Sequence, residues 1–392
     1  MSRHASRGRV ERGESGIVKI KVLIVDDSAL MRKYLREILG SDPDFEVYVA
    51  RNGHDGLNMV KEVDPAVVTL DINMPEMDGL TCLSHIMAES PRPVLMVSSL
   101  TTQGALSTFE ALELGAVDYI PKPDGTVSRN IKKISAELIA KVRSAARCRI
   151  RCSQGLRARQ RTRKGGAKRR SAAASTSRRP TVARVSSVKT VSLSGLLLIG
   201  ASTGGPRTLE KILGGLPADY PHPVLVAQHM PGHFTRVFAE RLAQDCQMPV
   251  DEVDQTIPLK PGRILIGKGD ADVLVGRRGG RRVALCVPPS NQYLWHPSVE
   301  RLVRTAMEHF PPTELTAVQL TGMGYDGADG MAELHRLGGR TIAESEETAV
   351  VFGMPQELIA KGGATVVLPC DRIAGQLCAW THEERSICTV PG

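Results

Sequence analysis

Short apolar runs recur along this chain in two blocks, and each run is followed by a segment of helical length. In the first block the runs cover residues 22–25, 66–70, 94–97 and 117–120. In the second they cover residues 196–199, 224–227, 264–266, 283–285 and 316–320. Short apolar runs that alternate with helices are typical of a parallel sheet with helices on both faces. The pattern therefore predicts two α/β domains, the second with a mostly parallel sheet.

The positive charge is concentrated in one segment. The net charge is +9, and residues 141–189 alone contribute +17, so the rest of the chain carries −8. Residues 148–190 also lack Phe, Tyr and Trp, and such a composition buries too little apolar surface to fold. We therefore predict a disordered tail at 1–17, an α/β domain at 18–147, a basic disordered linker at 148–190 and a second α/β domain at 191–382.

Cysteine spacing and hydropathy argue against several classes of protein. The eight cysteines contain no Cys-x-x-Cys pair, which argues against a zinc site or a disulfide framework. No apolar run approaches the roughly 20 residues of a membrane span, and no signal-peptide core follows the basic N-terminus. We expect a cytoplasmic protein.

Three aspartates follow predicted strands of the first domain. Asp26 and Asp27 come directly after residues 22–25, and Asp71 comes directly after 66–70. Because the carboxyl ends of parallel strands meet at one edge of a sheet, these side chains should converge. A single aspartate at a strand end is most often a turn former or a helix cap. Three carboxylates in one site repel one another and need a cation, and their hard oxygen ligands suit Mg²⁺.

A hydroxyl and an ammonium complete the predicted site. Ser98 and Lys122 each follow a later strand of the same domain, where they would contact a phosphoryl group on Asp71. The segment 71–79 also hints at an EF-hand loop. It fails, because a proline and a glutamate occupy positions that need Asp or Asn and Gly.

Together these residues resemble the receiver domain of response regulators. The match covers about residues 19–145 and rests on Asp26-Asp27, Asp71 before Met-Pro, Asp78-Gly79, Ser98 and Lys122-Pro123. The resemblance implies a flavodoxin-like (βα)5 fold with Asp71 as the phosphoacceptor. It implies that Mg²⁺ is held by Asp27, Asp71 and the Asn73 carbonyl, with Asp26 on a metal-bound water. Tyr119 falls where the family often has a switch aromatic, although an ordinary strand tyrosine fits equally well.

The second domain opens on a glycine-rich turn. The run 196–199 leads into Gly200-Ala-Ser202-Thr-Gly204, which has the spacing of a nucleophile elbow that lifts a serine hydroxyl above the sheet. By itself such a turn serves equally well as a phosphate cradle. A dinucleotide site is less favoured, because Gly-x-Gly-x-x-Gly is absent here.

A histidine and an aspartate favour the nucleophile. His229 follows the run 224–227, and Asp326 lies beyond the run 316–320, so both belong at the sheet edge that carries Ser202. A serine, a histidine and an aspartate, each past the end of a different parallel strand, form a charge-oriented nucleophile.

These motifs resemble the catalytic domain of the chemotaxis protein-glutamate methylesterase family, in which a receiver precedes the esterase. The matching stretches are 200–206, 228–231, 238–242, 297–299, 321–327 and 350–355. The resemblance implies that Ser202 is the nucleophile, His229 the general base and Asp326 the residue that orients His229. It also implies that the backbone amides of Thr203 and Met323 bind the oxyanion.

The chain departs from the family pattern in four places. Residues 267–272 lack an expected Ala-Pro-Gly and a nearby histidine, and Asp254-Gln255 stands where Asp-Gly is usual. Glu300 replaces an aspartate, and the linker is longer and more basic. None of these changes involves the Ser-His-Asp set, so they concern the choice of substrate and the packing of the domains.

We therefore expect a phosphorylation-activated serine esterase that hydrolyses glutamate γ-methyl esters on chemoreceptors, with deamidation of receptor glutamines as a related reaction. The resemblance implies Mg²⁺ in the receiver and no cofactor in the esterase. It implies a sensor histidine kinase as phosphodonor and recruitment to receptor arrays at the inner membrane face, where the linker would be attracted to anionic surfaces.

Two other functions compete with this expectation. A DNA-binding response regulator would use the basic linker, but no helix-turn-helix pattern follows Lys122 and the linker has no aromatic residues to stack on bases. A catalytically idle adaptor would not need Ser202, His229 and Asp326.

Overall fold

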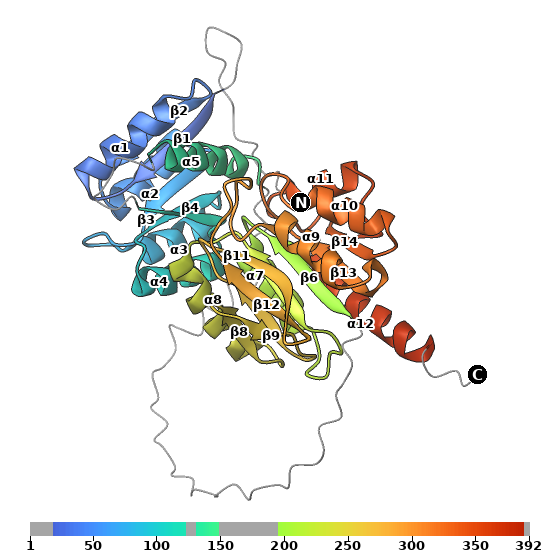
Figure 1. The fold of residues 1–392 in the computed structure, drawn as a ribbon. Helices are drawn as coiled ribbons and strands as arrows, with labels where there is room; N and C mark the ends of the chain where they lie inside the picture. The colour runs from blue at the N-terminus through green and yellow to red at the C-terminus, as the bar shows by residue number, and fades with distance from the viewer. Residues whose placement is uncertain (1–18, 123–130, 149–194, 388–392) are drawn as a thin grey trace, which may run out of the picture.

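The computed structural model describes residues 19–122, 131–148 and 195–387 (Figure 1). The predicted tail lies outside this range, as does the predicted linker except for Cys148. Two parallel sheets form the two halves of the molecule, and a small antiparallel sheet accompanies the second. The predicted fold class is confirmed.

The N-terminal domain is built on five parallel strands in the order β2-β1-β3-β4-β5. They are β1 (Ile20–Val25), β2 (Phe45–Ala50), β3 (Val67–Asp71), β4 (Val94–Ser98) and β5 (Asp118–Pro121). No predicted run covers β2. This edge strand is only half-buried and carries polar residues, so it lacks the continuous apolar run that marks a central parallel strand.

Five helices cover both faces of this sheet. They are α1 (Ala29–Gly40), α2 (Gly53–Val63), α3 (Gly79–Glu89), α4 (Thr102–Leu114) and α5 (Ile131–Ala145). The first four begin at side-chain caps that accept a backbone N–H, namely Ser28, Asn52, Asp78 and Thr101. Buried side chains of α1 and α5 share one apolar cluster, and those of α2, α3 and α4 belong to another, so the helices form a layer on each side.

The C-terminal domain is built on seven parallel strands in the order β15-β14-β13-β6-β7-β10-β8. They are β6 (Leu196–Ala201), β7 (Val224–Gln228), β8 (Val250–Val253), β10 (Ile264–Gly267), β13 (Leu315–Gln319), β14 (Arg340–Glu344) and β15 (Val366–Leu368). A separate antiparallel sheet contains β9 (Ile257–Pro258), β11 (Asp272–Arg278) and β12 (Arg281–Val287). The predicted run 283–285 lies in that smaller sheet.

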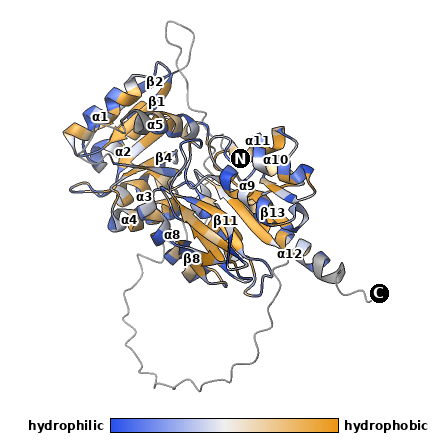
Figure 2. Ribbon diagram, viewed as in Figure 1, coloured by the Kyte–Doolittle hydropathy of each residue, from blue (hydrophilic) through white to orange (hydrophobic). Residues whose placement is uncertain are grey.

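Helices again cover both faces of the larger sheet. Residues of α7 (Gly205–Gly214), α8 (Gly232–Asp245) and α12 (Cys370–Ile387) pack in one cluster. Residues of α9 (Val299–His309), α10 (Ala328–Arg336) and α11 (Met354–Ala360) pack in another. Figure 2 shows the resulting pattern, with apolar strands inside and helices that alternate between polar and apolar faces. No helix within the described parts of the chain has the length and hydropathy of a membrane span.

The two domains meet through an aromatic cluster between α4 and α8. Phe109 stacks on Phe238 with ring centroids 5.5 Å apart and meets Phe234 edge-on at 6.2 Å. Tyr119 of β5 stacks on Phe234 at 4.6 Å. Phe109 and Tyr119 are almost fully buried, so the domains share one apolar core. Tyr119, at the position of the expected switch aromatic, is part of this contact.

Polar contacts surround the aromatic cluster. Thr203 donates its hydroxyl to Asp118 Oδ2 at 2.7 Å, and Lys141 Nζ lies 3.2 Å from the same oxygen. Glu113 of α4 pairs with Arg241 of α8. The contact between Asp118 and Thr203 is buried and lies one residue beyond Ser202, so the N-terminal domain touches the predicted nucleophile turn directly.

Candidate active site

Three carboxylates lie together at the carboxyl edge of the N-terminal sheet. Asp26 and Asp27 follow β1, Asp71 ends β3, and carboxylate oxygens of all three lie within 4.8 Å of one another. Asp26 and Asp71 are fully buried. Burial, with the nearby Asp71 charge, raises the pKa of Asp26 to about 6, and burial also raises the pKa of Asp71. A cation in this site would relieve the repulsion.

Lys122 supplies part of the missing positive charge. Its Nζ lies 2.7 Å from Asp71 Oδ2 and 3.8 Å from Asp26 Oδ2. Asp26 Oδ2 is nevertheless buried without a hydrogen-bond partner among the described residues. An orphaned carboxylate oxygen beside two further carboxylates matches the hard oxygen ligands that Mg²⁺ prefers. The residues present therefore fit the expected metal.

Of the other two residues predicted for the phosphoryl site, Asn73 lies beside the carboxylates and the hydroxyl of Ser98 is bonded to α4. Asn73 donates its backbone N–H to Asp71 Oδ1 at 3.2 Å and so lies beside the carboxylates. Ser98 ends β4, but its hydroxyl donates to the Gly104 carbonyl at 3.1 Å and accepts from Thr108 at 2.8 Å. The hydroxyl of Ser98 is therefore engaged with α4.

Ser202 lies on the tight turn between β6 and α7. Its backbone N–H donates to the Thr321 carbonyl at 3.0 Å, which ties the turn to the loop after β13. Gly204 has φ +78°, in the left-handed region that favours glycine. A Cβ on Gly205 would overlap Gln228 Oε1. The two glycines permit the sharp turn, and Ser202 remains half-buried at the sheet edge.

His229 and Asp326 lie at the same edge, and their side chains are paired. The His229 backbone N–H donates to the Ala201 carbonyl, beside Ser202. His229 Nε2 lies 2.8 Å from Asp326 Oδ2. Because an ionised carboxylate only accepts, Nε2 carries the hydrogen and Nδ1 carries the lone pair. Nδ1 is buried and unpartnered among the described residues, so its lone pair is free to accept a proton.

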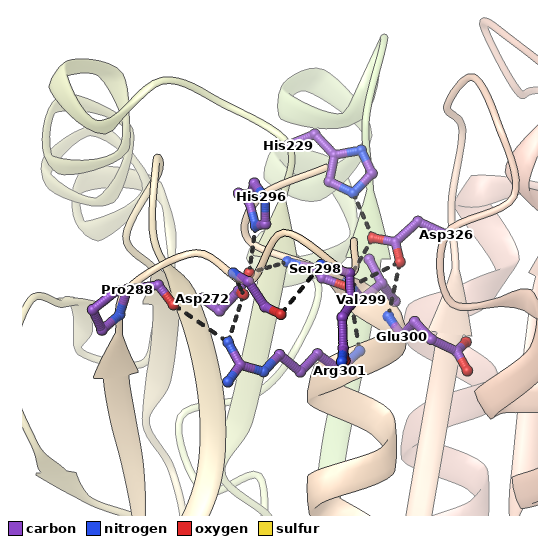
Figure 3. Close-up of polar contacts among 11 residues, drawn as sticks. His229, Asp272, Pro288, His296, Ser298, Val299, Glu300, Arg301 and Asp326 are labelled. Carbon is purple, nitrogen blue, oxygen red and sulfur yellow. Dashed lines mark hydrogen bonds and ion pairs between the residues drawn. The ribbon is translucent and has the colours of Figure 1, made fainter. Parts of the chain in front are cut away.

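The start of α9 holds Asp326 in place (Figure 3). Oδ1 accepts from the Ser298 hydroxyl and the Glu300 N–H, both at 3.0 Å, while Oδ2 accepts from the Val299 N–H at 2.7 Å. Burial alone would raise the pKa of Asp326. The hydrogen bond from His229 and the two amides outweigh it and hold that pKa below the ordinary aspartate value. Asp326 is therefore an anion positioned beside an imidazole.

The loop after β13 passes directly alongside Ser202. A Cβ on Gly322 would lie 2.7 Å from Ser202 Cβ, so Met323, the next residue, is near the serine. The Thr321 hydroxyl donates to the Thr203 carbonyl at 2.9 Å. Buried Glu344 accepts the Thr321 N–H at 2.8 Å. These contacts fix the two segments whose amides were expected to bind an oxyanion.

The sequence patterns missed Trp295. Its ring lies parallel to that of His229, with centroids 5.9 Å apart, and meets Tyr325 edge-on at 5.1 Å. Tyr325 and Leu294 are 53% and 64% exposed. Trp295 and Tyr325 therefore form an aromatic edge beside the imidazole. The only signal in the sequence was that the chain contains two tryptophans.

Two family models match this chain. Residues 22–131 match the response regulator receiver domain, and residues 197–377 match CheB methylesterase. The crystal structure of the Thermotoga maritima CheB methylesterase catalytic domain aligns with a TM-score of 0.46 and 37% identity, over 48% of this chain and all of that chain.

Curated relatives match nearly the whole length. A protein-glutamate methylesterase/protein-glutamine glutaminase 3 of Rhodospirillum rubrum is 56% identical over 92% of this chain and 96% of its own. Protein-glutamate methylesterase/protein-glutamine glutaminase 2 of Rhodopseudomonas palustris is 51% identical over 93% and 99%. With this agreement in both halves, the chain belongs to the CheB methylesterases that carry an N-terminal response-regulator receiver domain.

Proposed function

We propose that this protein is a serine esterase that removes methyl groups from glutamate γ-methyl esters of chemoreceptors, under the control of phosphorylation at Asp71. The observation that carries the proposal is the pairing of His229 with buried Asp326 beside the Ser202 turn. The names of the relatives, which specify protein-glutamate methylesterase and protein-glutamine glutaminase, support the choice of substrate.

The chemistry proceeds in two steps. Ser202 Oγ attacks the ester carbonyl while His229 Nδ1 takes its proton, and Asp326 stabilises the imidazolium that forms. The tetrahedral intermediate collapses, and methanol leaves with the proton from His229. Water then attacks the acyl-enzyme with the same histidine as base, and the product is a glutamate carboxylate. Attack of Ser202 on the side-chain amide of a glutamine follows the same path, with ammonia as the leaving group and hydrolysis of the same acyl-enzyme to glutamate, which accounts for the second activity in the relatives' names.

The Thr203 and Met323 amides are the proposed oxyanion donors. The Ser202 N–H already donates to Thr321, so the donors must come from neighbouring residues. Met323 follows the glycine that lies against Ser202, and the Thr203 carbonyl is fixed by the Thr321 hydroxyl. Amides preorganised in this way stabilise the developing negative charge without reorganisation.

Asp71 is the proposed phosphoacceptor, with a sensor histidine kinase as donor. Asp27, Asp71 and the Asn73 carbonyl would hold Mg²⁺, with Asp26 on a metal-bound water, and the ion would neutralise charge on the phosphoryl oxygens. Lys122 already contacts Asp71 and would pair with the phosphoryl group. Ser98 would contact that group only after leaving its bonds to α4. This rearrangement gives phosphorylation a route to the α4 surface that touches the esterase.

Ser202→Ala should abolish methanol release from methylated receptors, because it removes the attacking oxygen. Asp326→Asn should lower kcat by orders of magnitude but less than Ser202→Ala, since His229 loses the partner that fixes its tautomer. Ser41→Ala, on the surface of the N-terminal domain, is the matched control. If Ser202→Ala retains more than a few per cent of the wild-type rate, Ser202 is not the nucleophile.

Asp71→Asn should leave basal esterase activity intact and remove its stimulation by a small-molecule phosphodonor with Mg²⁺. Phosphorylation adds roughly −1.5 to −2 charge beside Lys122, and the variant has no carboxylate to accept it. Methanol release is measured with and without phosphodonor. Stimulation that persists in Asp71→Asn would assign the phosphoryl group to another residue.

Glu113→Arg should raise basal activity of the full-length protein by roughly two- to fivefold, the scale set by one partly exposed ion pair. The change places an arginine against Arg241, which weakens the contact between α4 and α8 and uncovers the esterase. Glu110→Arg makes the same charge change on the exposed side of α4 and serves as control. Equal basal rates for Glu113→Arg and wild type would argue against inhibition through this contact.

The basic linker is proposed to concentrate the enzyme at receptor arrays on the anionic inner membrane face. This segment lies outside the described residues, so its charge carries the proposal. Each Lys or Arg near such a surface contributes about 1 kcal/mol. Replacing the six arginines between 157 and 170 with glutamine should raise KM on membrane-embedded receptors at low salt and leave kcat unchanged.

The effect should disappear near roughly 0.5 M salt, where charges are screened within a few ångströms. Replacing the same arginines with lysine preserves the charge and should preserve KM. Equal KM values at low salt for the glutamine variant and the wild type would reduce the segment to a spacer. Salt-dependent retardation of DNA by the wild-type protein but not by the glutamine variant would favour the nucleic-acid alternative.

A further inference from the structure

A second buried carboxylate lies close to the Ser-His-Asp set. Asp272, the first residue of β11, is fully buried. Its Oδ1 accepts from the Ser298 N–H and pairs with His296 Nδ1, both at 2.9 Å. Its Oδ2 accepts from Arg301 Nη1 at 2.8 Å and from the Ser290 N–H at 3.2 Å. With four partners, Asp272 is among the most heavily hydrogen-bonded carboxylates in the described chain, yet it takes no part in the chemistry above.

Ser298 connects this carboxylate to Asp326. Its backbone N–H donates to Asp272, while its hydroxyl donates to Asp326 Oδ1 at 3.0 Å. The same hydroxyl accepts the Arg301 N–H and so caps α9. The two carboxylates therefore hold one residue from opposite sides, as Figure 3 shows.

Asp272 also holds the residues on either side of Ser298. His296 precedes it in the chain and Arg301 lies in the first turn of α9, and both bind the Asp272 carboxylate. The amides of Val299 and Glu300, between these two anchors, are the ones that donate to Asp326. The three groups that donate to Asp326 from the start of α9 therefore all lie in the segment 296–301. Asp272 of β11 binds this segment at His296, Ser298 and Arg301.

We propose that Asp272 is a positioning residue for the esterase, which fixes the 296–301 segment so that Ser298, Val299 and Glu300 hold Asp326 against His229. The inference rests on the proposed function, because it assigns Asp272 a role through Asp326. It concerns one of the segments, residues 267–272, in which this chain departs from the family pattern.

A merely structural role would lower activity equally whether or not Asp326 is present. A role through Asp326 predicts a different result in a double-mutant cycle. Asp272→Asn in the full-length protein should lower kcat for methanol release by roughly tenfold and change KM by less than about twofold. In the Asp326→Asn background the same change should lower kcat by less than about twofold, because the residue that Asp272 positions is already disabled.

Asp251→Asn is the matched control. Asp251 also pairs with an arginine, at 2.7 Å, but lies on the edge strand β8. The Asp251→Asn substitution should leave kcat unchanged. If Asp272→Asn does not fold, as judged by circular dichroism, Ser298→Ala replaces it in the cycle, since it removes the hydroxyl that reaches Asp326 and keeps Asp272. Ser298→Ala is expected to lower kcat as Asp272→Asn does, and again only when Asp326 is intact.

Two outcomes would overturn the inference. One is a kcat for Asp272→Asn, or for Ser298→Ala where it is used, that stays within about twofold of wild type. The other is an equal loss in both backgrounds. Failure of the proposed function has a different signature, because Ser202→Ala would then remain active, whatever the cycle gives.

Discussion

The hydrogen bond between Thr203 and Asp118 joins the regulatory half of this molecule to its chemistry. Thr203 follows the serine at the predicted nucleophile position, and its hydroxyl donates to a carboxylate at the start of β5. Lys122, which contacts Asp71, lies just beyond the end of that strand. One short strand therefore separates the proposed phosphorylation site from the proposed nucleophile turn. Any shift of β5 relative to its sheet changes the surroundings of Thr203.

An interface that phosphorylation controls must also be weak enough to open. A change from 1:99 to 99:1 in a two-state equilibrium requires about 5.5 kcal/mol. A hydrogen bond to a charged group contributes about 1.5 to 3 kcal/mol, so a phosphoryl group that gains two such bonds reaches this range. The aromatic contacts from the receiver side come from Phe109 and Tyr119. The polar contacts of the interface are the part that a change in charge can alter.

The sequence predicted most of the central strands, because parallel strands buried on both faces usually read as continuous apolar runs. It therefore also placed Asp26, Asp71, Ser202, His229 and Asp326, which follow those strands. It missed β2 and β8, which are edge strands that carry polar residues, and β15, an edge strand of only three residues. It also missed β14, a mostly buried interior strand whose sequence Arg-Thr-Ile-Ala-Glu contains no continuous apolar run. It also missed the roles of Asp272 and Trp295, because these depend on how β11 packs against α9 and the loop that precedes it. No local pattern encodes that packing.

The two buried carboxylates beside α9 differ in the kind of partner that each has. Asp272 is paired with the side chains of Arg301 and His296, so its charge is largely compensated. Asp326 is held by backbone amides and one hydroxyl, which carry no net charge. A cationic side chain on Asp326 would compete with the imidazolium that the proposed mechanism forms on His229. Amides at a helix N-terminus fix the carboxylate and leave its negative charge for His229. An arginine therefore suits Asp272, which positions the segment before α9. Backbone amides suit Asp326, which faces His229.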